Sequence, residues 1–314
     1  MLTRRVLLSA ALATPAFAQD GFSAFKAGVR AEAVRAGIRG GTVDAAFEGV
    51  APNPHILELD HHQPEFTQTW AQYRANILPE KRLHAARDAY TAEAGRLAEI
   101  TRRYPCDPRI VVGIWGLESN FGVRTGTYRI VEALGTLAYD GRRAGYFRKE
   151  LINALRILDN GDIAPRAMTG SWAGAMGQPQ FMPSSYLRYA VDADGDGRRD
   201  IWTNRADVFG SIANYLAQCG WRWGEPWGQQ VLVPANLGAT GRETVRSLAE
   251  WQAAGVRRAD GTRFSQPKVR GAVVQPDGPG GEAFMVYANF NAIRRYNPSD
   301  YYALAVGLLA YAAS

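Results

Sequence analysis

The sequence has little cysteine, little histidine and no long run of positive charge. Its 314 residues include 2 cysteines and 4 histidines. The histidines lie far from both cysteines along the chain, so the usual four-ligand zinc site is not expected. No run of Lys or Arg exceeds two residues, so the net charge of +6 provides no basic tract for nucleic acid. We therefore expect no nucleic-acid partner. The positive charge could serve solubility alone or attract another acidic polymer.

The composition also lacks the signs of disorder. Hydrophobic residues make up 46% of the chain and charged residues 21%, which is typical of globular proteins. A chain of this length buries a sizeable core and forms one large domain or two lobes.

Residues 1–18 have the three parts of a secretory signal peptide. Arg4 and Arg5 form the positive part, Val6 to Ala13 the apolar part, and Ala16-Phe17-Ala18 the cleavage signal. The apolar part is too short to cross the ~30 Å core of a bilayer, so we predict no membrane span. A first core helix is the alternative, and the sequence does not separate Sec from twin-arginine export.

Cys106 and Cys219 both lie beyond this segment. In an oxidising compartment such a pair can form a disulfide. Two buried free thiols also fit, because the sequence does not give the distance between them.

Residues 19–227 are predicted to be mainly helical, because apolar residues recur at helical spacing between capping signals. Strand-like runs follow at 228–284, and helical spacing returns at 285–314. We predict an α+β fold, mostly α, with a small inserted β-containing lobe and a last segment that packs back on the helical region. The expected helices are Phe22–Ala36, Leu78–Tyr104, one starting at Asp107, Tyr146–Leu158, Asp207–Cys219, Glu243–Ala253 and Ser299–Ala313; the expected strands are Val231–Pro234, Lys268–Val274 and Ala283–Ala288.

Glu118 lies at the end of an apolar run, Val111 to Leu117. Apolar surroundings disfavour the charged form of a carboxyl group, so they raise its pKa. A glutamic acid that stays protonated near neutral pH can act as a general acid. The alternative is an ordinary surface glutamate at a helix end.

The segment 170–186 combines small, polar and aromatic residues. Small residues fill most of 173–177, which lets backbone approach a neighbouring chain or a ligand closely. Such a mixture suits a wall that binds sugar, and a tight turn between helices is the alternative. The polar members are Ser171, Gln180 and Tyr186, and the flat apolar ones are Trp172, Met176 and Phe181.

The segment 192–200 matches a calcium-binding loop. Asp192, Asp194 and Asp196 stand at positions 1, 3 and 5, and glycine stands at position 6. Arg198 would offer its backbone carbonyl at position 7, and Asp207 could close the site because position 12 lacks the usual glutamate. The bound ion would be structural, and a solvated acidic turn is the alternative.

The segment 287–302 is dense in aromatic residues, with Arg and Asn among them. This mixture suits stacking on sugar rings, and ordinary helix packing is the alternative.

These segments, together with Gln63-Pro64-Glu65-Phe66, occur in the order found in one known family. From about Phe22 to its end, the chain resembles the lytic murein transglycosylase B family (glycoside hydrolase family 103). The resemblance implies a lysozyme-like helical core with Glu118 as the sole catalytic acid and base, and no cofactor for the chemistry. Its partner would be the glycan strands of peptidoglycan, cleaved without water between N-acetylmuramic acid and N-acetylglucosamine to a 1,6-anhydro product. A hydrolytic muramidase and a non-catalytic murein-binding protein are the alternatives.

The resemblance also implies roles for residues around Glu118. Ser171 and Gln180 would line the cleft beside it, and the acidic loop would be the structural calcium site. Gln178-Pro179 departs from the smaller or aromatic residues expected there and would reshape the wall locally. The absence of a lipobox cysteine implies a soluble periplasmic form. Residues expected to contact sugar or muropeptide are Tyr215, Tyr296, Tyr302, Arg142, Arg143 and, by a looser match, Tyr73.

Overall fold

The computed structural model describes residues 16–62 and 68–313. Residues 1–15 of the predicted signal peptide lie outside the described residues, and so do Gln63-Pro64-Glu65-Phe66. The helices are α1 (Ala16–Arg35), α2 (Gly40–Ala46), α3 (Pro54–His61), α4 (Trp70–Ile77), α5 (Glu80–Arg103), α6 (Pro108–Ser119), α7 (Ile130–Asp140), α8 (Ala144–Asn160), α9 (Pro183–Tyr189), α10 (Arg205–Gln218), α11 (Leu248–Ala253), α12 (Ala288–Tyr296) and α13 (Asp300–Ala312). The strands are β1 (Tyr128–Arg129), β2 (Thr169–Gly170), β3 (Gly228–Leu232), β4 (Arg246–Ser247), β5 (Arg257–Arg258), β6 (Arg270–Val274) and β7 (Ala283–Val286).

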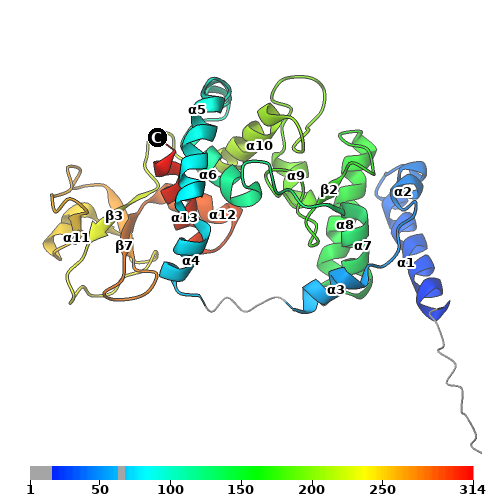
Figure 1. The fold of residues 1–314 in the computed structure, drawn as a ribbon, viewed down its shortest axis with the longest axis horizontal. Coiled ribbons are helices and arrows are strands. Elements are labelled where there is room, and N and C mark those ends of the chain that lie inside the picture. The colour runs from blue at the N-terminus through cyan, green and yellow to red at the C-terminus, as the bar shows by residue number, and fades with distance from the viewer. Residues whose placement is uncertain (1–15, 63–67, 314) are drawn as a thin grey trace, which may run out of the picture.

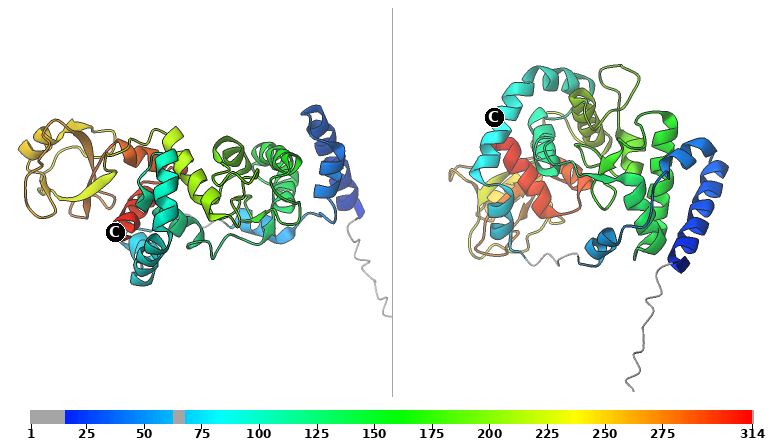
Figure 2. Two further views of the ribbon diagram at one scale, coloured as in Figure 1. Left: turned by 90° about the horizontal axis from the view of Figure 1, so that it is seen from above. Right: turned by 45° about the vertical axis from the view of Figure 1, so that its right-hand side comes forward.

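The described chain is mostly helical with a small sheet, which confirms the predicted fold class. It is elongated and has three parts side by side (Figure 1). One end holds α1, α2, α3, α7 and α8, the middle holds α4, α5, α6, α10, α12 and α13, and the other end holds the sheet with α11; the view from above shows the same order (Figure 2). None of the described helices has the length and apolar character needed to cross a membrane.

Helix α6 is buried along most of its length in the middle part. Its start follows the predicted signal, because the side chain of Asp107 accepts a hydrogen bond from the backbone N–H of Arg109 and Pro108 takes the first position. At Gly113 the helix meets α13 so closely that a Cβ would lie 2.7 Å from the carbonyl oxygen of Val306. The helix that carries Glu118 is therefore held firmly by its neighbours.

The larger sheet has the strand order β4-β6-β7-β3-β5 and antiparallel pairing. Successive side chains of a strand point to opposite faces. Ala272 and Val274 accordingly join the core of the middle part, whereas Val273 and Met285 pack with Trp251 of α11 in a separate cluster. The sheet thus links the helical middle to the outer lobe.

Three sequence expectations need correction at the level of elements. The helix expected at Glu243–Ala253 begins only at Leu248, because Ser247 and Glu250 form a capping box there. Within the helical segment expected at 285–314, the only helix assigned is Ser299–Ala313. The structure has a further helix before it, α12, whose apolar positions are interrupted by Asn and Arg. The strand expected at Ala283–Ala288 ends at Val286, because α12 begins at Ala288.

Both cysteines are free thiols. Cys106 is buried in the turn between α5 and α6, and Cys219 follows the end of α10, where its thiol lies 3.7 Å from the hydroxyl of Tyr189. Of the two possibilities that the sequence left open, the structure has the unbonded pair.

Candidate active site

Glu118 lies in the last turn of α6, where the helix ends abruptly. Asn120, Phe121 and Gly122 follow with φ of 50°, 58° and 83°, all in the left-handed region. Asn and Gly tolerate this conformation, but Phe121 is strained in it. Its ring is held edge-on to Trp115, with 5.5 Å between centroids. This fixed turn leaves Glu118 partly exposed at the end of an otherwise buried helix.

Glu118 as a residue is partly exposed, but protein atoms surround its carboxyl group. Burial raises its pKa from 4.5 to about 7. The hydroxyl of Tyr302 donates a 2.6 Å hydrogen bond to Oε1 and opposes this rise. Among the described residues, no second acidic side chain forms a hydrogen bond or ion pair with Glu118. A carboxyl group with this pKa can both give and take a proton near neutral pH.

Tyrosines from three helices interact electrostatically with Glu118. They are Tyr73 of α4, Tyr296 of α12 and Tyr302 of α13, and burial raises the pKa of each. The negative charge of Glu118 raises these pKa values further, and Tyr302 contacts the carboxyl group directly. Their hydroxyls therefore stay protonated and can donate hydrogen bonds. The structure thus brings together three tyrosines that the sequence resemblance singled out.

Tyr215, the fourth expected tyrosine, lies behind Tyr296. Their ring centroids are 4.7 Å apart, and Tyr215 donates its hydroxyl hydrogen to the backbone carbonyl of Arg295. Tyr296 itself donates to the carbonyl of Pro179 at 2.7 Å. In its present contacts Tyr215 supports the ring of Tyr296, whereas direct sugar binding stays a prediction.

Gln178 connects the 170–186 segment to the helix of Glu118. Its buried side chain accepts a 2.7 Å hydrogen bond from the indole N–H of Trp115 and donates a 2.8 Å bond to the carbonyl of Trp202. Trp115 stands one helical turn before Glu118, so Gln178 fixes the end of α6 from outside. The sequence marks Gln178 only as a departure from the family, and nothing local identifies Trp115 as its partner.

Ser171 and Gln180 use their side chains within their own segment. The hydroxyl of Ser171 accepts from the backbone N–H of Ala175 at 3.0 Å. Gln180, whose φ is 52°, donates to the carbonyls of Thr125 and Gly177 at 3.0 and 2.7 Å. These contacts match the tight-turn alternative, and neither side chain hydrogen-bonds to Glu118. Their contact with sugar stays a prediction.

Arg142 and Arg143 lie at the start of α8, outside the group of residues around Glu118. Arg142 donates to the backbone carbonyl of Asp60, and its Nε lies 3.5 Å from the buried carboxylate of the same residue. Arg143 lies over the ring of Phe147, 5.0 Å from its centroid. Arg142 therefore anchors α3 to α8, which the sequence did not predict, and Arg143 remains exposed.

The acidic loop gathers Asp192, Asp194, Asp196 and Asp207, whose nearest carboxylate oxygens all lie within 4.8 Å of one another. Asp207 is buried in α10, and its carboxylate accepts hydrogen bonds from the backbone of residues 193 and 200. Burial, and then the charges of Asp194 and Asp192, raise its pKa to about 6. Hard oxygen donors at this spacing fit a divalent cation such as calcium. Arg198 contacts the loop through its backbone N–H, which donates to Asp196 at 2.8 Å.

The fold and the site together define a class of enzyme. A mostly helical domain presents one protonatable glutamate at the end of a buried helix, with a tyrosine hydroxyl hydrogen-bonded to it. This arrangement supports acid–base cleavage of a glycosidic bond by a single carboxyl group, as distinct from the two-carboxylate scheme.

Comparison with known proteins identifies the family within this class. Residues 21–311 match the transglycosylase SLT domain, and the chain belongs to this family. Membrane-bound lytic murein transglycosylase B of Escherichia coli (strain K12) is 36% identical over 251 residues, which are 78% of this chain and 67% of that protein. These matches confirm the resemblance seen in the sequence.

Solved structures agree with this membership. SltB3 of Pseudomonas aeruginosa, in complex with NAG-anhNAM-pentapeptide, is 42% identical with a TM-score of 0.90 and covers 93% of this chain and 79% of its own. The lytic transglycosylase SLT35 of Escherichia coli, in complex with calcium, is 30% identical with a TM-score of 0.75 and covers 96% of this chain and 93% of its own.

Proposed function

We propose that this chain cleaves the glycan strands of peptidoglycan between N-acetylmuramic acid and N-acetylglucosamine, without water, to give 1,6-anhydromuramoyl products. The observation that carries the proposal is Glu118, a single carboxyl group with a pKa of about 7 beside three tyrosines. The similarity to SltB3, whose structure holds an anhydromuramoyl ligand, supports the same product.

In the first step, protonated Glu118 gives its proton to the glycosidic oxygen. The bond from that oxygen to C1 of the muramoyl sugar breaks, and its electron pair stays on the departing oxygen. The raised pKa of Glu118 supports this step, because the proton is present near neutral pH and leaves readily.

In the second step, the 6-hydroxyl oxygen of the muramoyl sugar bonds to C1, and its proton passes to the Glu118 carboxylate. The glutamate is then ready for another cycle. Intramolecular attack can have an effective molarity on the order of 10⁵–10⁸ M, so no activated water and no second carboxyl group are needed. Tyr302, which donates to Oε1, holds the carboxyl group in place and stabilises the charged state between the two steps.

We assign the substrate-binding wall to residues of both the helical region 19–227 and the last segment 285–314. Tyr73, Ser171 and Gln180 come from the first, and Tyr296 and Tyr302 from the second. The lobe at 228–284 contributes none of these residues. Removal of residues 1–18 on export would place the enzyme in the periplasm, where its polymer lies.

The acidic loop would hold a structural calcium ion through Asp192, Asp194, Asp196 and Asp207, with the Arg198 carbonyl as a further ligand. The cluster of carboxylate oxygens and the calcium complex of the related SLT35 support this assignment. A cation there would offset the repulsion among the four carboxylates and fix the loop against α10.

The products of digested cell-wall sacculi, measured by mass spectrometry, test the function. We expect muramoyl ends in the anhydro form. A true muramidase would give reducing ends, each heavier by one water, and finding only those would contradict the proposal. Sacculus binding with no released fragment would instead favour a non-catalytic binding protein.

A further inference from the structure

The turn between α10 and β3 carries an exposed tryptophan, Trp223, whose surface is 62% accessible. The fully buried Asn289 holds this turn. Its Oδ1 accepts from the backbone N–H of Arg222 at 2.7 Å, and its Nδ2 donates to the carbonyls of Arg222 and Glu225 at 2.9 and 2.7 Å. Three hydrogen bonds from one buried amide fix the exposed turn in advance, which lowers the entropy cost of binding there.

Two hollows border this turn and share Gly224, Glu225 and Pro226 in their walls. The smaller, about 430 Å³, includes Trp223 and Pro108 at the start of α6. The larger, about 680 Å³, lies between the turn and the β lobe. Glu118 follows Pro108 by ten residues, which is about 15 Å along the helix axis. The turn is therefore at the opposite end of α6 from the candidate active site.

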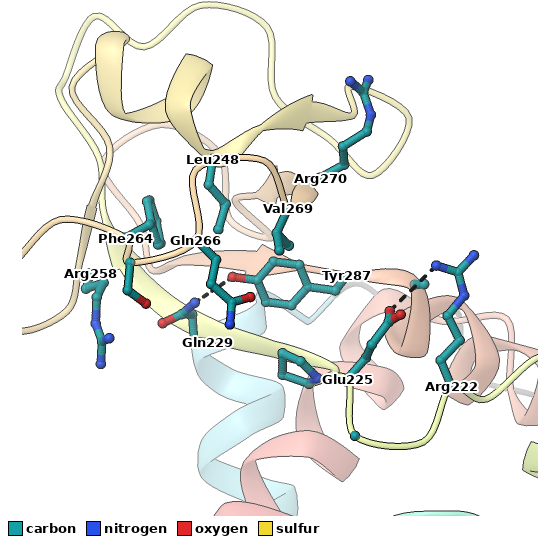
Figure 3. A pocket seen from close by; sticks show the side chains of 14 residues that line it. Arg222, Glu225, Gln229, Leu248, Arg258, Phe264, Gln266, Val269, Arg270 and Tyr287 are labelled. Carbon is teal, nitrogen blue, oxygen red and sulfur yellow. Dashed lines mark hydrogen bonds and ion pairs between the residues drawn. The ribbon is translucent and has the colours of Figure 1, made fainter.

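The larger hollow joins polar and apolar walls (Figure 3). Tyr287, only 7% exposed, accepts a 2.6 Å hydrogen bond from the amide of Gln229, and Gln266 lies close to it. Among the described residues, no acceptor is found for the Tyr287 hydroxyl hydrogen. Leu248 and Val269 face the same space from above. A sugar carries hydroxyl and acetamido groups that can accept this hydrogen and meet the apolar wall.

Charge is confined to the rim of the larger hollow. The charged lining residues are three arginines, Arg222, Arg258 and Arg270, and one acidic residue, Glu225. Their net charge is 3 − 1 = +2. Glu225 lies 3.6 Å from Arg222, and the guanidinium groups of Arg258 and Arg270 point away from Tyr287 (Figure 3). A neutral sugar inside with acidic substituents outside would match this pattern.

We propose that the Arg222–Pro226 turn and its two hollows form a second glycan-binding site, which holds peptidoglycan at a distance from the bond that is cleaved. One sugar stacks on Trp223, and another places its polar groups against Tyr287. Acidic groups of the attached peptide lie near the arginine rim. This inference rests on the proposed function, because it takes its ligand from the polymer that the enzyme cleaves.

Co-sedimentation with purified sacculi tests the site in the Glu118→Gln chain, which should leave the polymer intact. Trp223→Ala should weaken binding about fivefold or more, the scale of losing a well-placed aromatic anchor. Tyr287→Phe, which removes only the hydroxyl, should weaken it about two- to fivefold. Leu232→Ala is the matched control, because this side chain, on the adjoining strand β3, is 53% exposed and lines neither hollow.

A second measurement separates this site from the active site. With Glu118 intact, Trp223→Ala should slow release from sacculi yet turn over a short soluble sugar–peptide fragment at the wild-type rate. Wild-type binding by Trp223→Ala would overturn the proposal, and so would an equal loss of activity on the short fragment. Displacement from sacculi by free stem peptide as readily as by the sugar-bearing fragment would also overturn it. The sedimentation result does not depend on product chemistry, so a failure of the proposed function would be seen separately.

Discussion

The candidate active site and the acidic loop place carboxyl groups in opposite surroundings. Glu118 has no acidic neighbour among its described contacts, and burial raises its pKa to about 7. Asp192 accepts three backbone hydrogen bonds, of which that from Gly197 is the largest cause of its lowered pKa. Asp207, buried close to Asp192 and Asp194, has its pKa raised to about 6.

The comparison shows how burial, hydrogen bonds and neighbouring charges determine whether a carboxyl group suits proton transfer or cation binding. A lone carboxyl group with one hydrogen-bond donor keeps its proton near neutral pH, which suits proton transfer. In the acidic loop, backbone hydrogen bonds favour the charged form of the partly exposed Asp192. Burial and neighbouring negative charge disfavour the charged form of Asp207. Asp207 is stabilised as an anion only when a cation joins the cluster.

Glu118→Gln tests the first half of this comparison and should have the largest effect. Loss of the only acid and base should lower turnover of sacculi by at least 10²–10⁴-fold, the usual contribution of such a group. The fold should persist, because the glutamine carbonyl can still accept from Tyr302. Fragment release and thermal melting are the measurements. Glu99→Gln, on the exposed face of α5, is the matched control.

The stability of Glu118→Gln should also depend on pH. The pKa of Glu118 is raised in the folded state, so its stabilising contribution is full below about 4.5 and is lost as pH rises through about 7. The difference in Tm between the variant and wild type should therefore be more favourable to the variant at pH 8 than at pH 5. Equal differences in Tm at both values would contradict the raised pKa.

Removing calcium tests the second half. At a free concentration of 100 times Kd, an ion bound only by the folded state adds about 2.7 kcal/mol. Chelation should then lower the Tm by roughly 5–10 °C. Asp194→Asn should abolish the response, and Asp260→Asn, an exposed aspartate of the outer lobe, should keep it.

The pH dependence of the same measurement sharpens the test. Without ion, the pKa of Asp207 is raised, so its stabilising contribution is full below about 3.8 and is lost as pH rises through about 6. Calcium should therefore raise the Tm more at pH 7 than at pH 5. A chelator that leaves the Tm of calcium-loaded protein unchanged would count against a bound ion.

Gln178→Leu should have a smaller effect. It leaves the buried indole N–H of Trp115 without a partner, at a cost of about 1–3 kcal/mol, and also removes the part-buried hydrogen bond to the carbonyl of Trp202. Because Trp115 positions the end of α6, kcat should fall about tenfold and KM should change less than twofold. Both are measured at a temperature well below the Tm. Gln218→Leu, on the exposed face of α10, is the control. A lower Tm with full kcat would show that Gln178 has only a structural role.

Tyr302→Phe should have the smallest effect, seen as a shift in pH. In wild type, kcat/KM should decline as pH rises past about 7, because Glu118 loses its proton. The Tyr302 hydrogen bond lowers that pKa, so its removal should move the decline to higher pH by roughly one unit. Tyr301→Phe, whose hydroxyl is 3.4 Å from the Pro276 carbonyl, is the control. If kcat/KM declines at the same pH in the variant as in wild type, Tyr302 does not set the pKa of Glu118.

Much of the fold can be predicted from local pattern. The start of α6 at Asp107-Pro108, the end of α8 at Gly161 and the loop from Asp192 to Asp196 follow capping and ligand rules that involve neighbours in sequence. Strands β4 and β5 have two residues each, and such short strands depend on partners far along the chain. The partners of Arg142 and Gln178 are 82 and 63 residues away, beyond any local signal.

The sequence by itself determined that an acid closes an apolar helix and that several aspartates share one loop, because both are properties of adjacent residues. Only the tertiary structure decided what surrounds that acid. Tyr302 donates to Glu118 across 184 residues, and Tyr73 and Tyr296 approach from two other helices. The pKa of a carboxyl group depends on the water that packing removes and the charges that it brings near. The folded arrangement therefore determines the protonation state of Glu118.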